Sequence, residues 1–132
     1  RAAGIEPDAA YLIRGIHSEQ TGRAALAQWL DLPDPPTAII AISDLIAVGV
    51  LNEAEQRGLV VGRDISVIGF DDAPMTEYLR PALTTLRQPI EEIGAALIAM
   101  LEAAIKGDEP PQRQLLLPPR LIIRSSCGPA PR

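Results

Sequence analysis

Two adjacent carboxylates, Asp71 and Asp72, are the residues of this chain best placed for chemistry. They directly follow an apolar run, Ile65 to Phe70, which is typical of a buried strand. Charged side chains at the carboxyl end of a strand lie where open α/β sheets bind their ligands. One loop later a second extended segment, Thr84 to Gln88, brings an amide to another strand. This arrangement suits a polar small molecule with hydroxyl groups, so we expect Asp71 to contact a ligand and Asp72 to cap the loop.

Ser43 and His17 are weaker candidates for the same site. Ser43 and Asp44 come directly after another apolar run, Ala38 to Ile42. Serine is a preferred helix N-cap and an acid in the first turn complements the helix dipole, so a structural role explains both residues. Because the position is also the carboxyl end of a strand, we keep Ser43 as a second ligand contact. His17 is the only histidine, and a single histidine is most often a surface residue.

Catalysis has little support in the sequence. An Asp71–Asp72 pair that handled Mg²⁺ and phosphate would need alternate-residue spacing or a partner lysine, and the only lysine, Lys106, lies at a predicted helix end. A Ser43–His17–Asp71 triad would need a G-x-S-x-G turn, which the sequence lacks. One Cys and one His do not make a zinc site, and no phosphate-binding glycine motif occurs. We therefore predict a protein that is not an enzyme and has no metal or cofactor.

Length and composition fit one globular domain or most of one. The chain has 132 residues, of which 47 % are hydrophobic and 22 % charged, and its net charge is −5. An acidic chain without a basic stripe binds nucleic acid poorly by itself, and no apolar run approaches the ~20 residues of a membrane span. The single cysteine suits a reducing cytoplasm. Ala2-Ala3-Gly4 has the pattern of a helix end with its C-cap glycine, so we expect the chain to be part of a longer protein.

Strands and helices alternate along the predicted chain, and the strands are continuous apolar runs. This pattern is typical of a parallel, doubly wound α/β sheet with helices on both faces. Ser18 is the expected cap of the first helix, Gly58 ends the second, and Pro89 and Gly107 bracket the third. The expected strands are 10–14, 38–42, 65–70, 84–88, 115–117 and 121–125, the expected helices are 19–30, 44–57 and 89–106, and residues 72–83 form an irregular connection.

Three motifs resemble the lactose/galactose-repressor (LacI/GalR) family of bacterial transcriptional regulators. They are P-T-A-I-I-A-I-S-D at Pro36 to Asp44, D-I-S-V-I-G-F-D-D at Asp64 to Asp72, and P-A-L-T-T-L-R-Q-P-I-E-E-I-G at Pro81 to Gly94. Leu115 to Cys127 is similar to the end of that family's sensor domain. The resemblance implies a periplasmic-binding-protein-like (type I) sensor, incomplete here, in which two lobes close on a sugar or related metabolite.

The same resemblance implies the partners and the division of the chain. The full protein would be a cytoplasmic homodimer that contacts operator DNA only through an N-terminal headpiece absent from this chain, with no membrane partner. Residues 1–83 and 113–127 would form part of the C-terminal lobe of the effector-binding domain. Residues 84–107 would return to the N-terminal lobe, and residues 128–132 would form a flexible tail.

The family pattern also implies roles for individual residues. Asp71 matches an acceptor of effector hydroxyls, Gln88 a cleft residue on the crossing strand, and Ile90 a residue beside the pocket. Ser43 stands where the family usually has Asn, and His17 where many members have an aromatic residue that stacks on the sugar ring. These two departures argue against the usual hexose specificity. The implied dimer-forming surface consists of Val48, Leu51, Asn52, Met75, Tyr78 and Leu79.

Alternative readings of the sequence stay open. A periplasmic solute-binding protein of an ABC transporter would share the fold, although the P-x-L-T-T-x-R-Q-P segment favours the repressor family. A small α/β hydrolase or phosphatase is the less favoured alternative. If the central strand of the second lobe is absent from the chain, its sheet edges are exposed and two copies are expected to pair.

Overall fold

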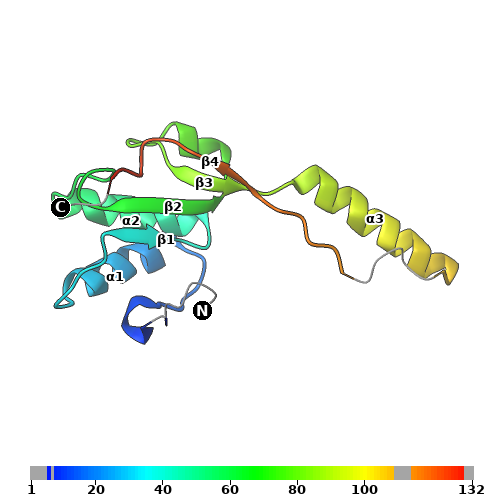
Figure 1. The fold of residues 1–132 in the computed structure, drawn as a ribbon, viewed down its shortest axis with the longest axis horizontal. Helices are drawn as coiled ribbons and strands as arrows, with labels where there is room; N and C mark the ends of the chain where they lie inside the picture. Colours follow the sequence, from blue (N-terminus) through cyan, green and yellow to red (C-terminus); the bar gives the residue numbers. More distant parts are fainter. Residues whose placement is uncertain (1–5, 7, 109–113, 130–132) are drawn as a thin grey trace.

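The chain forms a four-stranded, mostly parallel sheet with helices (Figure 1). The computed structural model describes residues 6, 8–108 and 114–129. The sheet order is β1-β2-β3-β4, in which the first three strands are parallel and β4 is antiparallel to β3. The predicted α/β class with a largely parallel sheet is confirmed. The strands are β1 (Ala38–Ile40), β2 (Ser66–Asp71), β3 (Thr84–Arg87) and β4 (Arg120–Ile122).

Two N-capped helices, α1 (Glu19–Leu30) and α2 (Asp44–Gln56), pack against each other beside the sheet. The Ser18 hydroxyl accepts a hydrogen bond from the Thr21 N–H over 3.1 Å, so the predicted cap is confirmed. The two helices approach closely at a pair of glycines. A Cβ at Gly22 would lie 2.0 Å from the Ile46 carbonyl oxygen, and one at Gly49 would lie 1.9 Å from the Glu19 carbonyl oxygen. Only glycine leaves room for this contact.

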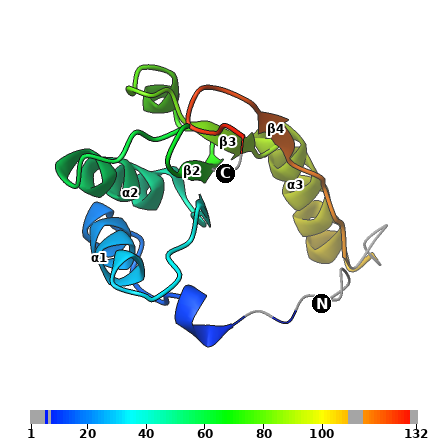
Figure 2. The ribbon, with the colours of Figure 1, turned by 60° about the vertical axis from the view of Figure 1, so that its left-hand side comes forward.

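The hydrophobic core lies between these two helices and one face of the sheet. Leu26, Val50, Val67 and Leu83 are its largest fully buried apolar side chains. Figure 2 shows α1 and α2 on the same side of the sheet. Along β2 buried and partly exposed residues alternate, and Ile40 at the end of β1 is 75 % exposed. Helices on both sheet faces were therefore the wrong expectation for the described residues, because α3 does not fold back over the second face.

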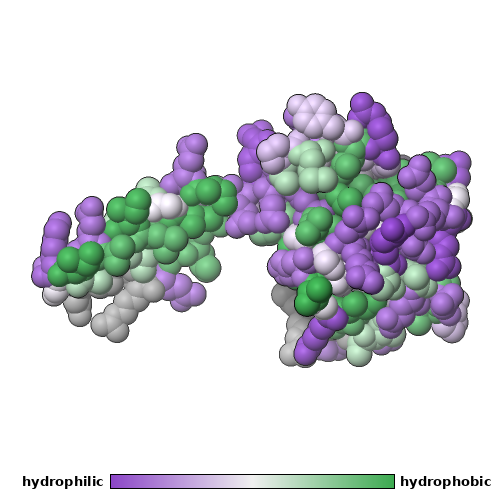
Figure 3. Space-filling model, turned by 180° about the vertical axis from the view of Figure 1, so that it is seen from behind, coloured by the Kyte–Doolittle hydropathy of each residue, from purple (hydrophilic) through white to green (hydrophobic). Residues whose placement is uncertain are grey.

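Helix α3 (Ile90–Lys106) instead leads away from the sheet (Figures 1 and 3). It begins after Pro89 and ends at Gly107, whose φ of 78° is the left-handed C-cap conformation expected of glycine. None of its residues is buried. Residues 114–117 run beside it and line a shared apolar pocket. Leu97, Ile98, Leu101 and Ile105 are exposed, and Figure 3 shows the apolar surface that extends along the helix.

The structure corrects three strand predictions. Residues 10–14 are not a strand: a short 3-10 helix, η1 (Ala9–Tyr11), stands there, and the Asp8 carboxylate accepts from the Ala10 N–H over 2.9 Å. The Trp29 indole N–H of α1 also donates to the Ala10 carbonyl oxygen over 3.1 Å, so a short turn and a side-chain contact stand where a sheet ladder was expected. Residues 115–117 have no regular structure, and the strand expected over 121–125 is limited to β4.

One further sequence prediction is confirmed, and two others concern residues that the structure does not describe. The connection after β2 is irregular apart from the short 3-10 helix η2 (Pro74–Glu77), as predicted. The helix end expected at Ala2–Gly4 and the last part of the tail, 130–132, lie outside the described residues. Among the described helices, none is long and apolar enough to span a membrane.

Candidate ligand-binding site

Asp71 and Gln88 meet at the carboxyl ends of neighbouring parallel strands. Asp71 is the last residue of β2 and is in register with Arg87, the last residue of β3. Gln88 follows immediately, and its side-chain Nε2 donates to Asp71 Oδ1 over 2.7 Å. Both residues border an open pocket of about 390 Å³, which Ile90 and the first turn of α3 also line. The acid–amide pair predicted from the sequence therefore lies at one site.

The backbone turns sharply where β2 ends. Asp71 has a φ of 121° and Asp72 a φ of 56°, and positive φ values are uncommon outside glycine. The turn is held by its surroundings: the Ala73 N–H donates to Asp44 Oδ2 over 2.7 Å, and the Asp72 N–H donates to the Thr85 hydroxyl over 3.4 Å. Such conformations persist where neighbouring groups impose them, and they cluster at ligand sites. Asp71 is left exposed, whereas the Asp72 side chain is only 4 % exposed.

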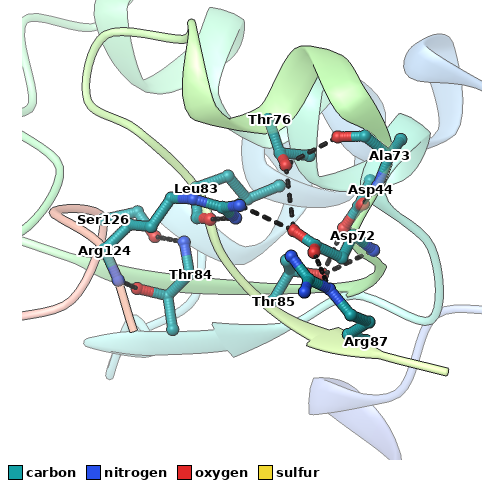
Figure 4. Close-up of polar contacts among 10 residues, drawn as sticks. All are labelled: Asp44, Asp72, Ala73, Thr76, Leu83, Thr84, Thr85, Arg87, Arg124 and Ser126. Carbon is teal, nitrogen blue, oxygen red and sulfur yellow. Dashed lines mark hydrogen bonds and ion pairs between the residues drawn. The ribbon is translucent and has the colours of Figure 1, made fainter. Parts of the chain in front are cut away.

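Asp72 is held by two arginines (Figure 4). Its Oδ1 pairs with Arg124 Nη2 at 2.7 Å, and its Oδ2 pairs with Arg87 Nε. Arg124 Nη1 also donates to the Leu83 carbonyl oxygen over 2.8 Å. Burial raises the pKa of Asp72, but the hydrogen bonds and charges of Arg124 and Arg87 outweigh burial and hold its pKa below the ordinary value. The structural role expected for Asp72 agrees with this burial.

Asp44 has a buried role that was not predicted from the sequence. It was assigned only to the first turn of a helix, yet it is 2 % exposed and its Oδ1 accepts from the Thr85 hydroxyl over 2.6 Å. A Cβ at Gly69 would lie 2.2 Å from Asp44 Oδ1, so glycine in β2 leaves room for the carboxylate. A glycine inside an apolar strand was the available signal, because it often marks a close approach by another group.

Ser43 and His17 do not line the Asp71–Gln88 pocket in the described structure. Ser43 is 6 % exposed, and its hydroxyl accepts from the Ile46 N–H over 3.4 Å, which is the cap role. His17 is exposed just before α1. Of the five residues expected at the ligand site, Asp71, Gln88 and Ile90 therefore share one pocket. The described residues include no group of three His, Cys, Asp or Glu that could hold a metal ion.

The residues expected on a dimer surface fall into two groups. Leu51 belongs to the core, Val48 is 9 % exposed, and Asn52 donates to Glu19 of α1 over 2.8 Å. These three residues are engaged within one copy of the chain. Met75 and Tyr78, in the loop after β2, are 47 % and 72 % exposed, whereas Leu79 beside them is half-buried against the core. A dimer surface stays a prediction, and the loop supplies its exposed apolar part.

A second pocket, apolar and about 250 Å³ in volume, lies beside β1. It is lined mainly by aliphatic side chains of residues 13–15, α1, α2 and the stretch 39–42. It lacks the convergent polar groups that usually orient a polar small ligand. The Asp71–Gln88 pocket is therefore the better candidate for the ligand site.

A mostly parallel α/β sheet with an acid and an amide at its carboxyl edge has the arrangement at which open α/β domains bind their ligands. A family model described as a periplasmic binding protein-like domain matches residues 1–127, and the chain belongs to this family. More particularly, it corresponds to the sensor-domain portion of LacI-family transcriptional regulators.

Known proteins of this kind resemble the chain over nearly all of its length. The HTH-type transcriptional repressor CytR of Escherichia coli (strain K12) is 40 % identical over 131 residues, which is 99 % of this chain and 38 % of CytR. A regulatory protein of the LacI family from Chloroflexus aggregans superposes with a TM-score of 0.84 at 44 % identity, covering 96 % of this chain and 46 % of that chain. The transcriptional regulator CelR in complex with cellobiose has a TM-score of 0.83 at 34 % identity, covering 95 % of this chain and 38 % of that chain.

The chain therefore spans less than half the length of each of these relatives. The relatives are transcriptional regulators and not enzymes, in agreement with the prediction from the sequence. The LacI-family resemblance of the three sequence motifs is confirmed.

Proposed function

We propose that this chain is the effector-sensing part of a bacterial transcriptional regulator and that its effector is a small polyhydroxylated molecule, most simply a sugar. The observation that carries the proposal is the Asp71–Gln88 pair at the carboxyl edge of the sheet. A carboxylate accepts hydrogen bonds from hydroxyl groups, and an amide both donates and accepts. The CelR–cellobiose complex supports a sugar as the class of effector.

The pocket suits an effector that brings hydroxyl donors. Asp71 is exposed and its Oδ1 already accepts from Gln88, so its other oxygen and the Gln88 amide oxygen are the acceptors that ligand hydroxyl groups would use. Glu91 and Glu92 line the same pocket, which disfavours an anionic effector. A neutral polyol is therefore favoured over a phosphorylated one. Ser43 and His17 lie outside this pocket, and they stay secondary predictions.

The remaining parts of the proposal follow from the regulator class. The whole protein would act in the cytoplasm as a homodimer and contact operator DNA through a helix-turn-helix segment outside this chain. Residues 84–107 would lead to a second lobe, with the departure at Gln88, because Thr84–Arg87 is paired within the sheet as β3. Effector binding would favour one arrangement of the lobes, which requires only a difference in affinity between the two arrangements. The regulator names of the relatives favour this function over a periplasmic solute receptor.

The proposal is tested by calorimetric titration of the regulator that carries this chain with cellobiose, ribose and glucose, and with glucose 6-phosphate as the anionic counterpart. We expect saturable heat with at least one neutral sugar and at least tenfold weaker binding of the phosphorylated sugar, which is about 1.4 kcal/mol. Binding of no neutral sugar, together with tight binding of the phosphorylated one, would contradict the proposal.

A further inference from the structure

The two acids at the end of β2 hold two consecutive residues at the end of β3. Asp71 accepts from Gln88, and Asp72 pairs with Arg87. The strand register places Arg87 opposite Asp71, not opposite Asp72. The guanidinium therefore bonds to the carboxylate of the residue that follows its register partner. Arg87 is 55 % exposed in its side chain, so little packing holds it there.

Asp71 lies opposite Arg87 in the strand register, and both residues line the same pocket, so Asp71 is an alternative partner for the guanidinium. A guanidinium binds a carboxylate with two parallel hydrogen bonds and is a far stronger partner than a neutral amide. If Arg87 bonded to Asp71, it would displace Gln88 and occupy the oxygens that a ligand hydroxyl needs. A neutral ligand can therefore reach Asp71 only if another group holds the Arg87 guanidinium away from the Asp71 carboxylate.

We propose that Asp72 is a positioning residue that keeps Arg87 away from Asp71 and so leaves the Asp71–Gln88 pair free for the effector. The effect on effector binding rests on the proposed function, whereas the position of Arg87 relative to Asp71 does not. Asp72 suits this role because its side chain is almost fully buried. A fixed buried carboxylate holds a guanidinium more firmly than an exposed one does.

The role is separated from plain structural support by three variants. D72N removes the negative charge that holds Arg87 but keeps the shape of the side chain. R124Q removes the other partner of Asp72, so it is expected to destabilise the fold while the Asp72–Arg87 pair stays in place. The double variant D72N/R87Q removes the competing guanidinium itself.

The first readout needs no effector: the side-chain amide signals of Gln88 in ¹H–¹⁵N NMR spectra of the effector-free regulator, assigned by their loss in Q88E. We expect D72N to shift these signals, R124Q to leave them in place, and D72N/R87Q to return them toward the wild-type positions. Unmoved signals in D72N, or no return in the double variant, would overturn the proposal. A purely supporting role predicts the same response for D72N and R124Q.

The second readout is the affinity of the regulator for a neutral sugar that binds the wild type. We expect D72N to weaken binding at least tenfold and D72N/R87Q to recover most of that loss. D64N is the matched control, because Asp64 also pairs with an arginine but lies in the loop before β2. Equal sugar affinity in D72N and the wild type would overturn the positioning role. Failure of every neutral sugar to bind the wild type would count against the proposed function alone, because the NMR readout still tests the position of Arg87.

Discussion

The Asp44 carboxylate accepts a 2.6 Å hydrogen bond from the Thr85 hydroxyl and thereby joins the first turn of α2 to β3. Its second oxygen accepts from the Ala73 N–H over 2.7 Å, so the same side chain also holds the loop after β2. Asp44 is 2 % exposed and Thr85 is fully buried. One residue at a helix start therefore fixes the turn from which Asp71 and Asp72 project.

We expect Asp44→Ala to lower the free energy of unfolding by about 3 kcal/mol, because it leaves a buried hydroxyl and a backbone N–H without their acceptor. Urea denaturation followed by circular dichroism measures this change. Asp31→Ala, which alters an exposed acid just after α1, is the control and is expected to change stability by about 0.5 kcal/mol or less. Equal stability of the two variants would show that the Asp44 bonds contribute little.

Gly22→Ala and Gly49→Ala are each expected to destabilise the chain by about 2 kcal/mol or more. A Cβ at either position would lie about 2 Å from a backbone carbonyl oxygen of the facing helix, and backbone cannot move aside cheaply. Gly94→Ala in α3 is the matched control, because nothing lies within 4 Å of its Cβ position. It should leave stability unchanged or raise it by up to about 1 kcal/mol. Chemical denaturation of the three variants separates packing from helix propensity.

Stability is expected to fall as the pH drops below about 4. Arg63 and the Val60 N–H lower the pKa of Asp64 to about 2 from 3.8, and the pKa of Asp72 is also below its ordinary value. The unfolded chain therefore takes up protons near pH 4 while the folded chain does not, which favours unfolding as the pH falls. Urea unfolding at about pH 6, 4 and 3 measures the loss. D64N should flatten the curve, and an unchanged free energy between about pH 6 and 3 in the wild type would contradict the assignment.

The isolated chain is expected to self-associate at micromolar concentration. Ile42 is 65 % exposed beside the sheet edge, and Leu101 and Ile105 on α3 are 60 % and 77 % exposed. Exposed apolar surface of this kind favours association. Light scattering should give more than a monomer mass, and the L101E/I105E variant should shift the mass toward the monomer, whereas K106E should not. A monomeric wild type would contradict the prediction.

The helices were predictable from the sequence because their signals are local. Ser18 and Ser43 accept from their own first turns, and Gly107 adopts the left-handed conformation at the end of α3, so each boundary depends on a few adjacent residues. The strand predicted over residues 10–14 was wrong for the opposite reason. Their apolar pattern suits a strand, but a strand forms only beside a partner, and here Ala9–Tyr11 form a short 3-10 helix that bonds to Asp8 and to the Trp29 side chain.

The candidate site was predictable only in part. Asp71 and Gln88 were found because the carboxyl ends of parallel strands must lie together. The partners of Asp72 could not be read from the sequence, because Arg87 and Arg124 are 15 and 52 residues away along the chain. The contacts of Asp44 with Thr85 and Ala73 were missed because its position in the first turn of a helix already explained an acidic residue there.

The central claim is that Asp71 contacts the effector, and it is tested most directly by calorimetric titration of the regulator carrying Asp71→Ala with the neutral sugar that binds the wild type. We expect affinity to fall at least tenfold, since the change removes a charged acceptor, while the fold is retained because the Asp71 side chain is exposed. Asp64→Ala should bind like the wild type. An Asp71→Ala regulator that binds the sugar with wild-type affinity would contradict the account.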